Sequence, residues 1–521
     1  MKVSGKTMAE KHGNKEADGK YAGKTMKYGI GKAVRQTAVL CLLLAAFFTG
    51  CGRQEEETAG KAAPVHLVWY QIGARQDDLE EVQKQVNAYT ESRIGVTVEI
   101  VPVNWNDYNT KMRNIINTGA EWDLAFSSSW ANDYLENAQR GALLALDDLL
   151  PKYGSDLLSG IDERFWRAAR INGEIYGVPS EKEIGNMPMW VFTKEYVDKY
   201  DIPYQDIHTL EDLEPYLALI REKEPGVVPL YLTADFTAPT YMDKITDPVG
   251  IEYGDETLTV KNVFETQRMQ ETLQTLHRYF EAGYINSDAA VARDDKSVKR
   301  FVTKGDGQPY AETSWSKSLG HPVVASQIME TQITNASARG ALTVISKDCR
   351  HPEKAVEFLN LVNTDQYLRN LLNYGIENVH YEKVPVTQEE KEAAEGKSYI
   401  YDCKVHLLEN SGYSVPYYVQ GGLFTTWVPD TDPIDKWDTF QAYNKKSVEA
   451  PTFGFDFDAG RVQTQISNFR IILDEYGPAL YTGSVDPQVY LPKLVEKLKE
   501  NGMQDVIDEM QRQIDLWKEK S

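Results

Sequence analysis

The strongest constraint on the fold is an alternation of short apolar strands and amphipathic helices that begins at Val65. The apolar run 66–70 predicts a buried strand, and the helical spacing of apolar side chains over residues 79–89 predicts a helix after it. The pattern continues as strand, helix and strand over residues 94–103, 107–118 and 122–126. This order is typical of a parallel sheet covered by helices, so we expect an α/β fold.

Three loops should meet beyond the carboxyl ends of these strands, where parallel sheets bind their ligands. They contain Tyr70, then Trp105 with Asp107, then the serines 127–129 followed by Trp130. Sugars present flat apolar faces ringed by hydroxyl groups, so a sugar site combines aromatic side chains with polar ones. The three loops therefore predict a site of this kind.

Trp105, Trp130 and Trp315 are the candidate aromatic platforms, because each lies in or beside a loop expected at the ligand cleft. A single Trp more often belongs to a core or to surface packing. The prediction therefore depends on the joint placement of the three rings.

The candidate polar ligands each have a structural alternative. Ser128 and Ser129 would donate hydroxyl and backbone N–H groups to a solute, or they would cap the helix that follows. Glu181 and Glu183 would accept hydrogen bonds from sugar hydroxyls or bind a cation, or they would lie in a solvated loop. Asp107 is a weaker candidate, since its position also fits a helix cap.

Length and charge limit the classes of protein. A chain of 521 residues with 42% hydrophobic content can form two lobes, each with its own core. Its net charge of −22 repels nucleic acid and anionic lipid, so we expect no nucleic-acid partner. Attachment to a membrane would then require a covalent anchor.

Such an anchor is predicted at Cys51, which follows a basic flank and an eleven-residue apolar run, 38–48. The run is shorter than the roughly 20 apolar residues of a membrane span but fits a signal peptide. The residues Phe48-Thr49-Gly50-Cys51 resemble a bacterial lipobox, with Phe48 in place of the usual leucine. This implies a diacylglycerol group on Cys51 and a location on the extracellular face of the cell membrane. We expect a leader and signal peptide over residues 1–50 and a flexible acidic tether over residues 51–63. Translation would start at Met1 or at Met26, and Met26 gives a signal peptide of normal length.

The remaining cysteines and the histidines predict no disulfide framework and no metal. Cys349 and Cys403 are interpreted as two separate buried thiols, with a single bridge between them, outside the cytoplasm, as the alternative. Eight scattered histidines show no metal-ligand spacing, so neither a metal nor another cofactor is expected. Asp456 and Asp458 alternate with aromatic residues, which is more typical of an edge strand than of a metal site.

Several stretches together resemble extracellular solute-binding proteins of family 1, the maltose-binding-protein-like receptors of ABC importers. Besides the lipobox and the strand–helix alternation, they are Gly173–Pro179, Phe301–Gly305 ahead of Ser314-Trp315, and Ala341–Ser346 followed by Pro352–Leu359. Two more specific motifs, Asn373–Glu377 with His380-Tyr381 and Tyr481–Pro487, resemble a Gram-positive lipoprotein branch with a C-terminal domain of unknown function.

This resemblance implies a two-lobed, periplasmic-binding-protein-like type II fold with a solute cleft between the lobes. Lobe 1 would comprise residues 64–179 plus about 322–372, and lobe 2 about 180–321 plus about 373–521. Tyr374 and Glu377 would reach the cleft, unless their motif serves hinge packing. The resemblance also implies a monomeric receptor that passes an oligosaccharide or related carbohydrate to a membrane permease.

An extracytoplasmic glycan-active enzyme is the main alternative, since glycosidases also combine aromatic clefts with paired carboxylates. Glu181 and Glu183 would be that pair, but nothing in the sequence places a sugar bond between them. No Gly-x-Ser-x-Gly, His-Glu-x-x-His or phosphate-loop motif is present, so we predict a binding protein and not an enzyme. The sequence also leaves open a surface sensor or adhesion module without a transporter.

Overall fold

Five strands form the central sheet of the first lobe in the computed structural model, which describes residues 63–185, 187–393, 403–409 and 411–519. The sheet order is β2-β1-β3-β15-β6. Its first three strands are parallel, as predicted, whereas β15 runs antiparallel to both β3 and β6. The strands are β1 (Val65–Ile72), β2 (Val96–Val103), β3 (Leu124–Ser127), β6 (Gly177–Pro179) and β15 (Leu342–Ile345).

Helices cover this sheet because their apolar faces meet apolar strand residues. Trp69 of β1 contacts Phe358 of α12 edge to face, with ring centroids 5.6 Å apart. The predicted helix start at Pro352 is confirmed, and its fixed φ suits the first turn. The helices are α1 (Leu79–Ile94), α2 (Tyr108–Thr118), α3 (Tyr134–Gln139), α4 (Leu150–Tyr153), α5 (Ser155–Gly160), α6 (Glu163–Ala169), α11 (Asn335–Ala338), α12 (Pro352–Thr364) and α13 (Gln366–Tyr374), and a hairpin joins β4 (Arg170–Ile171) to β5 (Glu174–Ile175).

A four-stranded sheet of order β13-β7-β12-β8 lies in the second lobe, and the three-stranded sheet β11-β10-β9 shares its hydrophobic core. The strands are β7 (Met187–Thr193), β8 (Val228–Leu230), β9 (Met242–Thr246), β10 (Val249–Glu252), β11 (Lys261–Asn262), β12 (Arg300–Gly307) and β13 (Val323–Gln327). The helices are α7 (Lys194–Lys199), η1 (Tyr204–Asp206), α8 (Leu210–Lys223), η2 (Val263–Glu265), α9 (Gln267–Glu281) and α10 (Ala311–Leu319).

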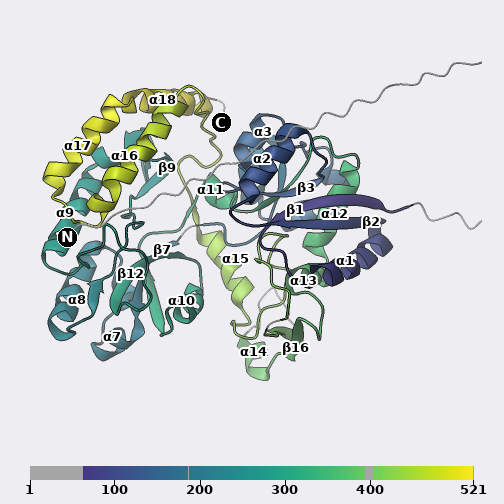
Figure 1. Ribbon diagram of the computed structural model, residues 1–521, viewed down its shortest axis with the longest axis horizontal. Helices are drawn as coiled ribbons and strands as arrows, with labels where there is room; N and C mark the ends of the chain where they lie inside the picture. Colours follow the sequence, from purple (N-terminus) through teal and green to yellow (C-terminus); the bar gives the residue numbers. More distant parts are fainter. Residues whose placement is uncertain (1–62, 186, 394–402, 410, 520–521) are drawn as a thin grey trace, which may run out of the picture. The chain divides into compact units, whose positions relative to one another are not determined.

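Three C-terminal helices complete the second lobe, where α16 and α17 contact α9 (Figure 1). They are α16 (Gln463–Tyr481), α17 (Pro487–Glu500) and α18 (Met503–Lys518). Leu498, Met510 and Ile514 are fully buried in the core of this lobe. The two helices predicted at the C-terminus are therefore confirmed.

Part of the segment 374–446 packs against the core of the first lobe, whereas the expected partition assigned all of it to lobe 2. Tyr413 and Val419 belong to the first core, and the Tyr413 hydroxyl donates to the Leu372 carbonyl. We expected the chain to return to lobe 1 at about residue 322. At this point it still belongs to the second lobe, because β13 pairs with β7 in the sheet of that lobe. Residue order alone does not reveal which core a long connection covers. The elements here are β16 (Tyr381–Pro385), α14 (Gln388–Ala393), β17 (Cys403–Leu407) and α15 (Lys436–Lys446).

The segments that cross between the lobes are tied to one another. The second crossing runs between β13 and β15, and the third runs between α15 and α16. β14 (Gln332–Ile333) of the second crossing pairs in parallel with β18 (Val448–Glu449) of the third. Nearby, the buried guanidinium of Arg339 donates to both carboxylate oxygens of Asp456. This ion pair accounts for Asp456 without a metal.

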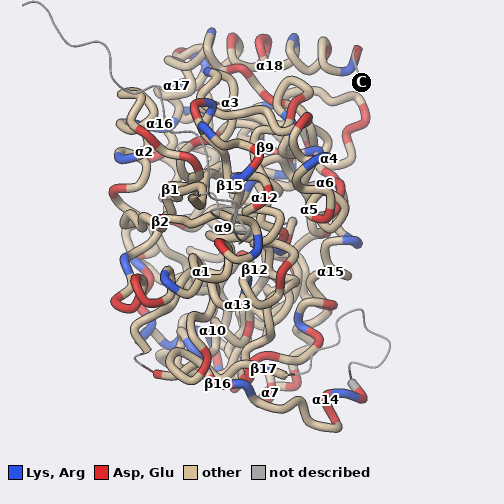
Figure 2. Tube along the Cα trace, turned by 90° about the vertical axis from the view of Figure 1, so that its right-hand side faces the viewer, with Lys and Arg blue, Asp and Glu red and all other residues tan. Residues whose placement is uncertain are grey.

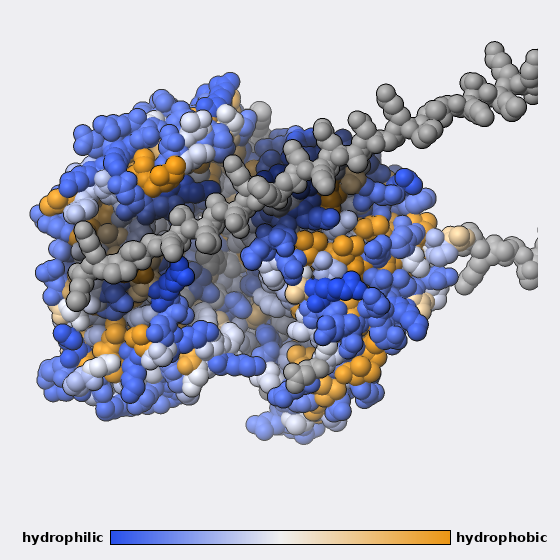
Figure 3. All heavy atoms as spheres, viewed as in Figure 1, coloured by the Kyte–Doolittle hydropathy of each residue, from blue (hydrophilic) through white to orange (hydrophobic). Residues whose placement is uncertain are grey.

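The surface is polar and mixed in charge. Figure 2 shows acidic and basic residues interspersed over outer helices such as α14 and α18, and the face in Figure 3 is mainly hydrophilic. No helix in the described part of the chain is long and apolar enough to cross a membrane. The predicted leader, the Met26 start, the Cys51 lipobox and the tether up to residue 62 lie outside the described residues. Cys349 and Cys403 form no disulfide with each other in the described part of the chain.

The burial of the C-terminal helices predicts their contribution to stability. Replacing Met510 by Ala should lower the free energy of unfolding by about 2 to 5 kcal/mol, because it leaves a cavity in the core. Ile471→Ala, at a side chain that is 68% exposed on α16, is the matched control and should change it little. Urea unfolding followed by circular dichroism measures both. Equal effects would contradict the burial of α18 in this core.

Candidate functional site

Two cavities lie side by side in the cleft and share Tyr417 and Gln308 as lining residues. The first, here called the Trp130 chamber, has a volume of about 430 Å³ and is lined by Trp130, Lys182, Glu183, Asp306, Tyr418 and residues of the second crossing. The second, the Trp437 chamber, has about 550 Å³ and is lined by the 411–417 loop, the end of α13 and the start of α15. Each is large enough for a small organic ligand.

The turn after β3 holds the Trp130 ring in the first chamber. The Ser128 hydroxyl oxygen accepts hydrogen bonds from the backbone N–H groups of Trp130 and Ala131, at 3.2 and 2.8 Å. The indole N–H of Trp130 donates to the Gly340 carbonyl at 2.9 Å, which fixes the ring plane. The residue nevertheless remains 48% exposed, so part of its surface is accessible to a ligand.

Further aromatic rings surround Trp130. Trp105 stacks on it with ring centroids 6.0 Å apart and an interplanar angle of 18°. Tyr418 meets it edge to face at 6.4 Å, and Tyr417 in turn meets Tyr418 at 5.2 Å. These rings form a continuous aromatic surface on which sugar rings can stack.

Tyr417 is held by a buried arginine. Arg369 of α13 is fully buried and donates to the backbone carbonyls of Tyr417 and Gly422, both at 2.8 Å. Burial lowers the pKa of Arg369 to about 10, which still leaves the guanidinium charged at neutral pH. The hydroxyl of Tyr417 donates to Glu183 Oε1 at 3.2 Å.

The two candidate carboxylates occupy different environments. Glu183 lines the Trp130 chamber and pairs with Lys182 at 3.0 Å. Glu181 is not among the lining residues, and its Oε1 accepts from the backbone N–H of Asp162 at 3.3 Å. Burial, reinforced by the charge of Asp162, raises the pKa of Glu181 to about 7. The pair considered for catalysis is therefore not assembled around one cavity.

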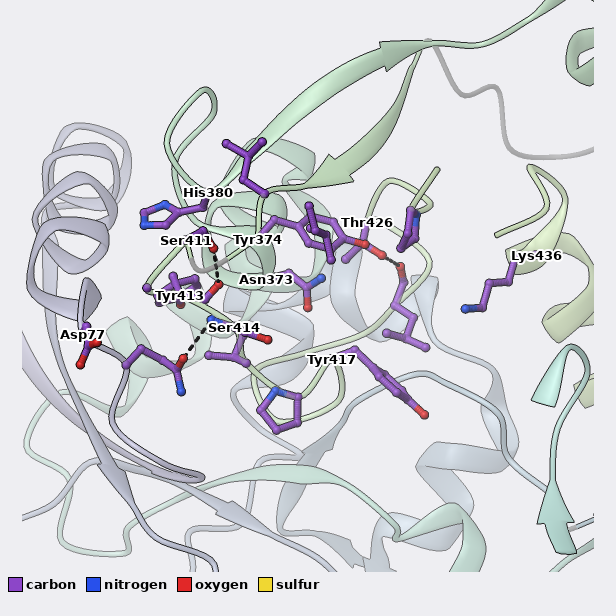
Figure 4. A pocket seen from close by; sticks show the side chains of 18 of the residues that line it. Asp77, Asn373, Tyr374, His380, Ser411, Tyr413, Ser414, Tyr417, Thr426 and Lys436 are labelled. Atoms are coloured by element: carbon purple, nitrogen blue, oxygen red, sulfur yellow. Dashed lines mark hydrogen bonds between the residues drawn. The ribbon is translucent and has the colours of Figure 1, made fainter. Parts of the chain in front are cut away.

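The Trp437 chamber combines apolar walls with a few polar side chains. Figure 4 shows His380 and Tyr413 toward one end of the labelled residues and Lys436 at the other. The buried rings of Trp437 and Phe440 form part of the wall. The Tyr374 hydroxyl also faces the protein, because it donates to the Trp427 carbonyl at 2.7 Å.

The structure brings together some of the predicted residues. Trp130 and Glu183 line the same chamber, with Trp105 stacked on Trp130, and Tyr374 lines the Trp437 chamber. Ser128 is buried in its turn, and the Ser129 hydroxyl donates to the Ala336 carbonyl, so both serines serve local structure. Neither serine caps α3, where Asp133 does so.

Other predicted residues lie away from both chambers. Trp315 covers β12, where a methyl group on Gly307 would come within 2.6 Å of its ring. Glu377 forms an ion pair with Lys383 at 3.1 Å. Neither chamber is lined by Trp315, Glu377, Glu181, Tyr70 or Asp107.

Sequence reasoning missed several lining residues, namely Asp306, Gln308, Tyr417, Tyr418 and Trp437. The adjacent tyrosines 417 and 418, close to Gly421 and Gly422, were a usable signal for an exposed aromatic loop. Among the described residues, no group of three or more His, Cys, Asp or Glu side chains is arranged to hold a metal ion.

Two α/β lobes joined by crossing segments around a solute cleft define the class of type II binding proteins. Residues 73–368, more than half of the chain, match the family described as bacterial extracellular solute-binding protein, and the chain belongs to this family. Residues 451–519, which include α16–α18, match a domain of unknown function (DUF3502). The predicted family, branch and fold are thus confirmed.

Named relatives agree with this assignment. A carbohydrate ABC transporter substrate-binding protein of Streptococcus pneumoniae serotype 4 is 30% identical over 484 residues, covering 91% of this chain and 95% of the relative. Lipoprotein LipO of Bacillus subtilis is 22% identical over 240 residues, covering 44% of this chain and 46% of LipO.

Solved structures of the N-glycan transport solute binding protein (NgtS) of Streptococcus pneumoniae are also similar. One is 30% identical with a TM-score of 0.77, covering 88% of this chain and all of that one. Its complexes with Man1GlcNAc and Man5GlcNAc give TM-scores of 0.66 and 0.63 at the same identity, covering 86% and 88% of this chain and 98% and 99% of theirs.

The raised pKa of Glu181 predicts a pH dependence of stability. Between pH 4.5 and about 7 the folded protein holds a proton that the unfolded chain has lost, so the free energy of unfolding falls as pH rises through this range. Glu181→Gln should therefore match the unaltered protein at pH 4 and exceed it at pH 8 by roughly 1 to 3 kcal/mol. Urea unfolding at both pH values tests this, with Glu91→Gln on the exposed face of α1 as control. A variant that is less stable at pH 8 would contradict it.

Proposed function

We propose that this protein is a lipid-anchored extracellular receptor of an ABC importer that captures an oligosaccharide of the N-glycan type. The observation that carries the proposal is the pair of adjoining chambers, which share Tyr417 and Gln308 and include the half-exposed ring of Trp130. A cleft of this length suits several linked sugar units better than one monosaccharide.

The relatives support the ligand class. The similar proteins from Streptococcus pneumoniae are described as a carbohydrate ABC transporter substrate-binding protein and as an N-glycan transport solute binding protein. Glycans of mannose and N-acetylglucosamine are bound in two of the similar structures. In this chain, Trp130, Tyr417 and Tyr418 would stack against sugar rings, and Glu183 would accept hydrogen bonds from hydroxyl groups.

Lobe closure would follow from the origin of the lining residues. Trp130 belongs to the first lobe. Asp306 lies at the end of β12 in the second lobe, and Gln308 follows that strand. A ligand that contacts both sides binds the closed arrangement more tightly, so it shifts the population toward closure. The closed form would then deliver the solute to the membrane permease.

We propose binding without hydrolysis. A retaining glycosidase needs two carboxyl groups about 5 to 5.5 Å apart around one sugar bond, and an inverting enzyme about 6.5 to 9.5 Å. Glu183 faces the chamber, but Glu181 is engaged by the backbone of Asp162. An engaged, buried Glu181 fits a structural role better than a catalytic one.

Isothermal titration calorimetry on the compact unit Ala62–Ser521 is the direct test. Man5GlcNAc should bind, whereas a peptide or nucleotide control should not, and the glycan should be recovered unchanged. Lack of binding to every glycan in a panel would contradict the proposal. Turnover of the glycan that is lost in Glu183→Gln would favour an enzyme instead.

Replacing Trp130 by Ala should weaken glycan binding by about 1 to 3 kcal/mol, because it removes a stacking surface. Tyr490→Ala is the matched control, since this ring lies on α17 and is also partly exposed. Calorimetry gives both affinities. Unchanged affinity in Trp130→Ala would remove this ring from the site.

The proposed anchor on Cys51 predicts that membrane attachment can be lost without loss of glycan binding. Replacing Cys51 by Ser should release the protein from the membrane and impair uptake, while the glycan affinity of the purified protein stays the same. Two acyl chains on one cysteine suffice for stable attachment, which the acidic surface alone does not provide. Cell fractionation and calorimetry measure the two effects. A loss of affinity would contradict an anchor that is separate from the binding fold.

A further inference from the structure

We infer that the Trp437 chamber binds an N-acetylhexosamine unit of the captured glycan, while the Trp130 chamber binds its neutral hexose units. This inference rests on the proposed function and assigns a different type of sugar unit to each chamber. It starts from the different chemistry of their walls.

The Trp437 chamber has the more apolar wall. Leu408, Val415, Pro429, Trp437 and Phe440 all line it. A hexose offers mainly hydroxyl groups, each of which loses hydrogen bonds to water when it enters such a wall. The methyl group of a 2-acetamido substituent instead gains from contact with an apolar surface.

The polar groups of this chamber suit an amide. Gln76, Asn373 and Gln308 contribute side-chain amides to its lining. Gln76 is already committed, since its Oε1 accepts from the Ser414 backbone N–H at 2.9 Å and its amide nitrogen donates to the Ala74 carbonyl. Among the described residues, the side-chain amide of Gln308 has no hydrogen-bond partner. It can therefore donate to and accept from an acetamido group.

The charged groups of the chamber favour a neutral ligand. Arg75 pairs with Glu80 at 2.8 Å, and Lys436 pairs with Asp432 at 2.7 Å. The third basic lining residue, His380, accepts the Ile376 backbone N–H at Nδ1 and faces Asp78 through Nε2 at 3.3 Å. The basic side chains that line this chamber thus already have partners within the protein, which makes an anionic sugar a poor fit.

The Trp130 chamber has the complementary composition. Glu183 and Asp306 provide carboxylate oxygens beside the rings of Trp130, Tyr417 and Tyr418. Carboxylates accept from sugar hydroxyls, and aromatic faces contact the apolar side of a hexose. Because Tyr417 and Gln308 line both chambers, one oligosaccharide can occupy both at once.

The triacetylated form of chitotriose, called chitotriose below, and cellotriose provide a matched pair of probes. The first carries 2-acetamido groups where the second carries 2-hydroxyl groups. We expect calorimetry on the unaltered protein to show at least tenfold tighter binding of chitotriose. Saturation-transfer NMR should show the strongest contact at the acetyl methyl group. Equal affinities, or a methyl group without saturation, would overturn the inference while leaving glycan binding intact.

Ser414→Trp tests the location, because Ser414 is exposed and lines the Trp437 chamber. The larger side chain should fill the chamber, lower chitotriose affinity at least tenfold and abolish the methyl signal, whereas Ile471→Trp, at an exposed position of α16 outside both chambers, should leave both unchanged. Gln308→Leu, which removes the free amide at nearly constant size, should likewise reduce the preference for chitotriose and serves if Ser414→Trp fails to fold. Full retention of the preference in a folded Ser414→Trp or in Gln308→Leu would overturn the inference. If the unaltered protein binds no glycan, the proposed function fails and this inference with it.

Discussion

The cleft depends on a guanidinium group that is fully buried and bound mainly by backbone carbonyls. Arg369 reaches from α13 into the 417–422 loop and binds the carbonyl groups of Tyr417 and Gly422. A buried charge is tolerated when hydrogen bonds replace its hydration, so these contacts must persist for the charge to remain inside. The loop is thereby fixed, and with it the tyrosine that separates the two chambers.

A second ionic contact joins two of the crossing segments. Arg339 pairs with Asp456, and the carbonyl of the neighbouring Gly340 accepts the indole N–H of Trp130. The orientation of the Trp130 ring therefore depends on a crossing segment as well as on the turn that follows β3.

The sequence predicted the first lobe well because its signals are local. Apolar periodicity defined β1, α1, β2, α2 and β3, and the ends of parallel strands pointed to the loop of Trp130, which lines the Trp130 chamber. The last two helices, α17 and α18, were likewise predicted from their amphipathic pattern.

The rest of the site arises from contacts between residues far apart in sequence. The position of Tyr417 follows from Arg369, 48 residues away, and no periodicity signals such a contact. Trp315 was expected at the cleft but lies elsewhere. Gly305 and Gly307 have no side chains, so its ring packs directly on β12, away from the chambers. Glu181 and Glu183 are neighbours in sequence, yet Glu181 accepts from the backbone N–H of Asp162, whereas Glu183 lines the Trp130 chamber.

The shared position of Tyr417 has a consequence for stoichiometry. Since one ring forms part of the wall of both chambers, two short sugars would compete for the same surface and for the same hydroxyl group. A single longer chain meets no such conflict, and its second unit binds at the high effective concentration set by the glycosidic link to the first. The proposed site would therefore favour one longer ligand per protein over two short ones.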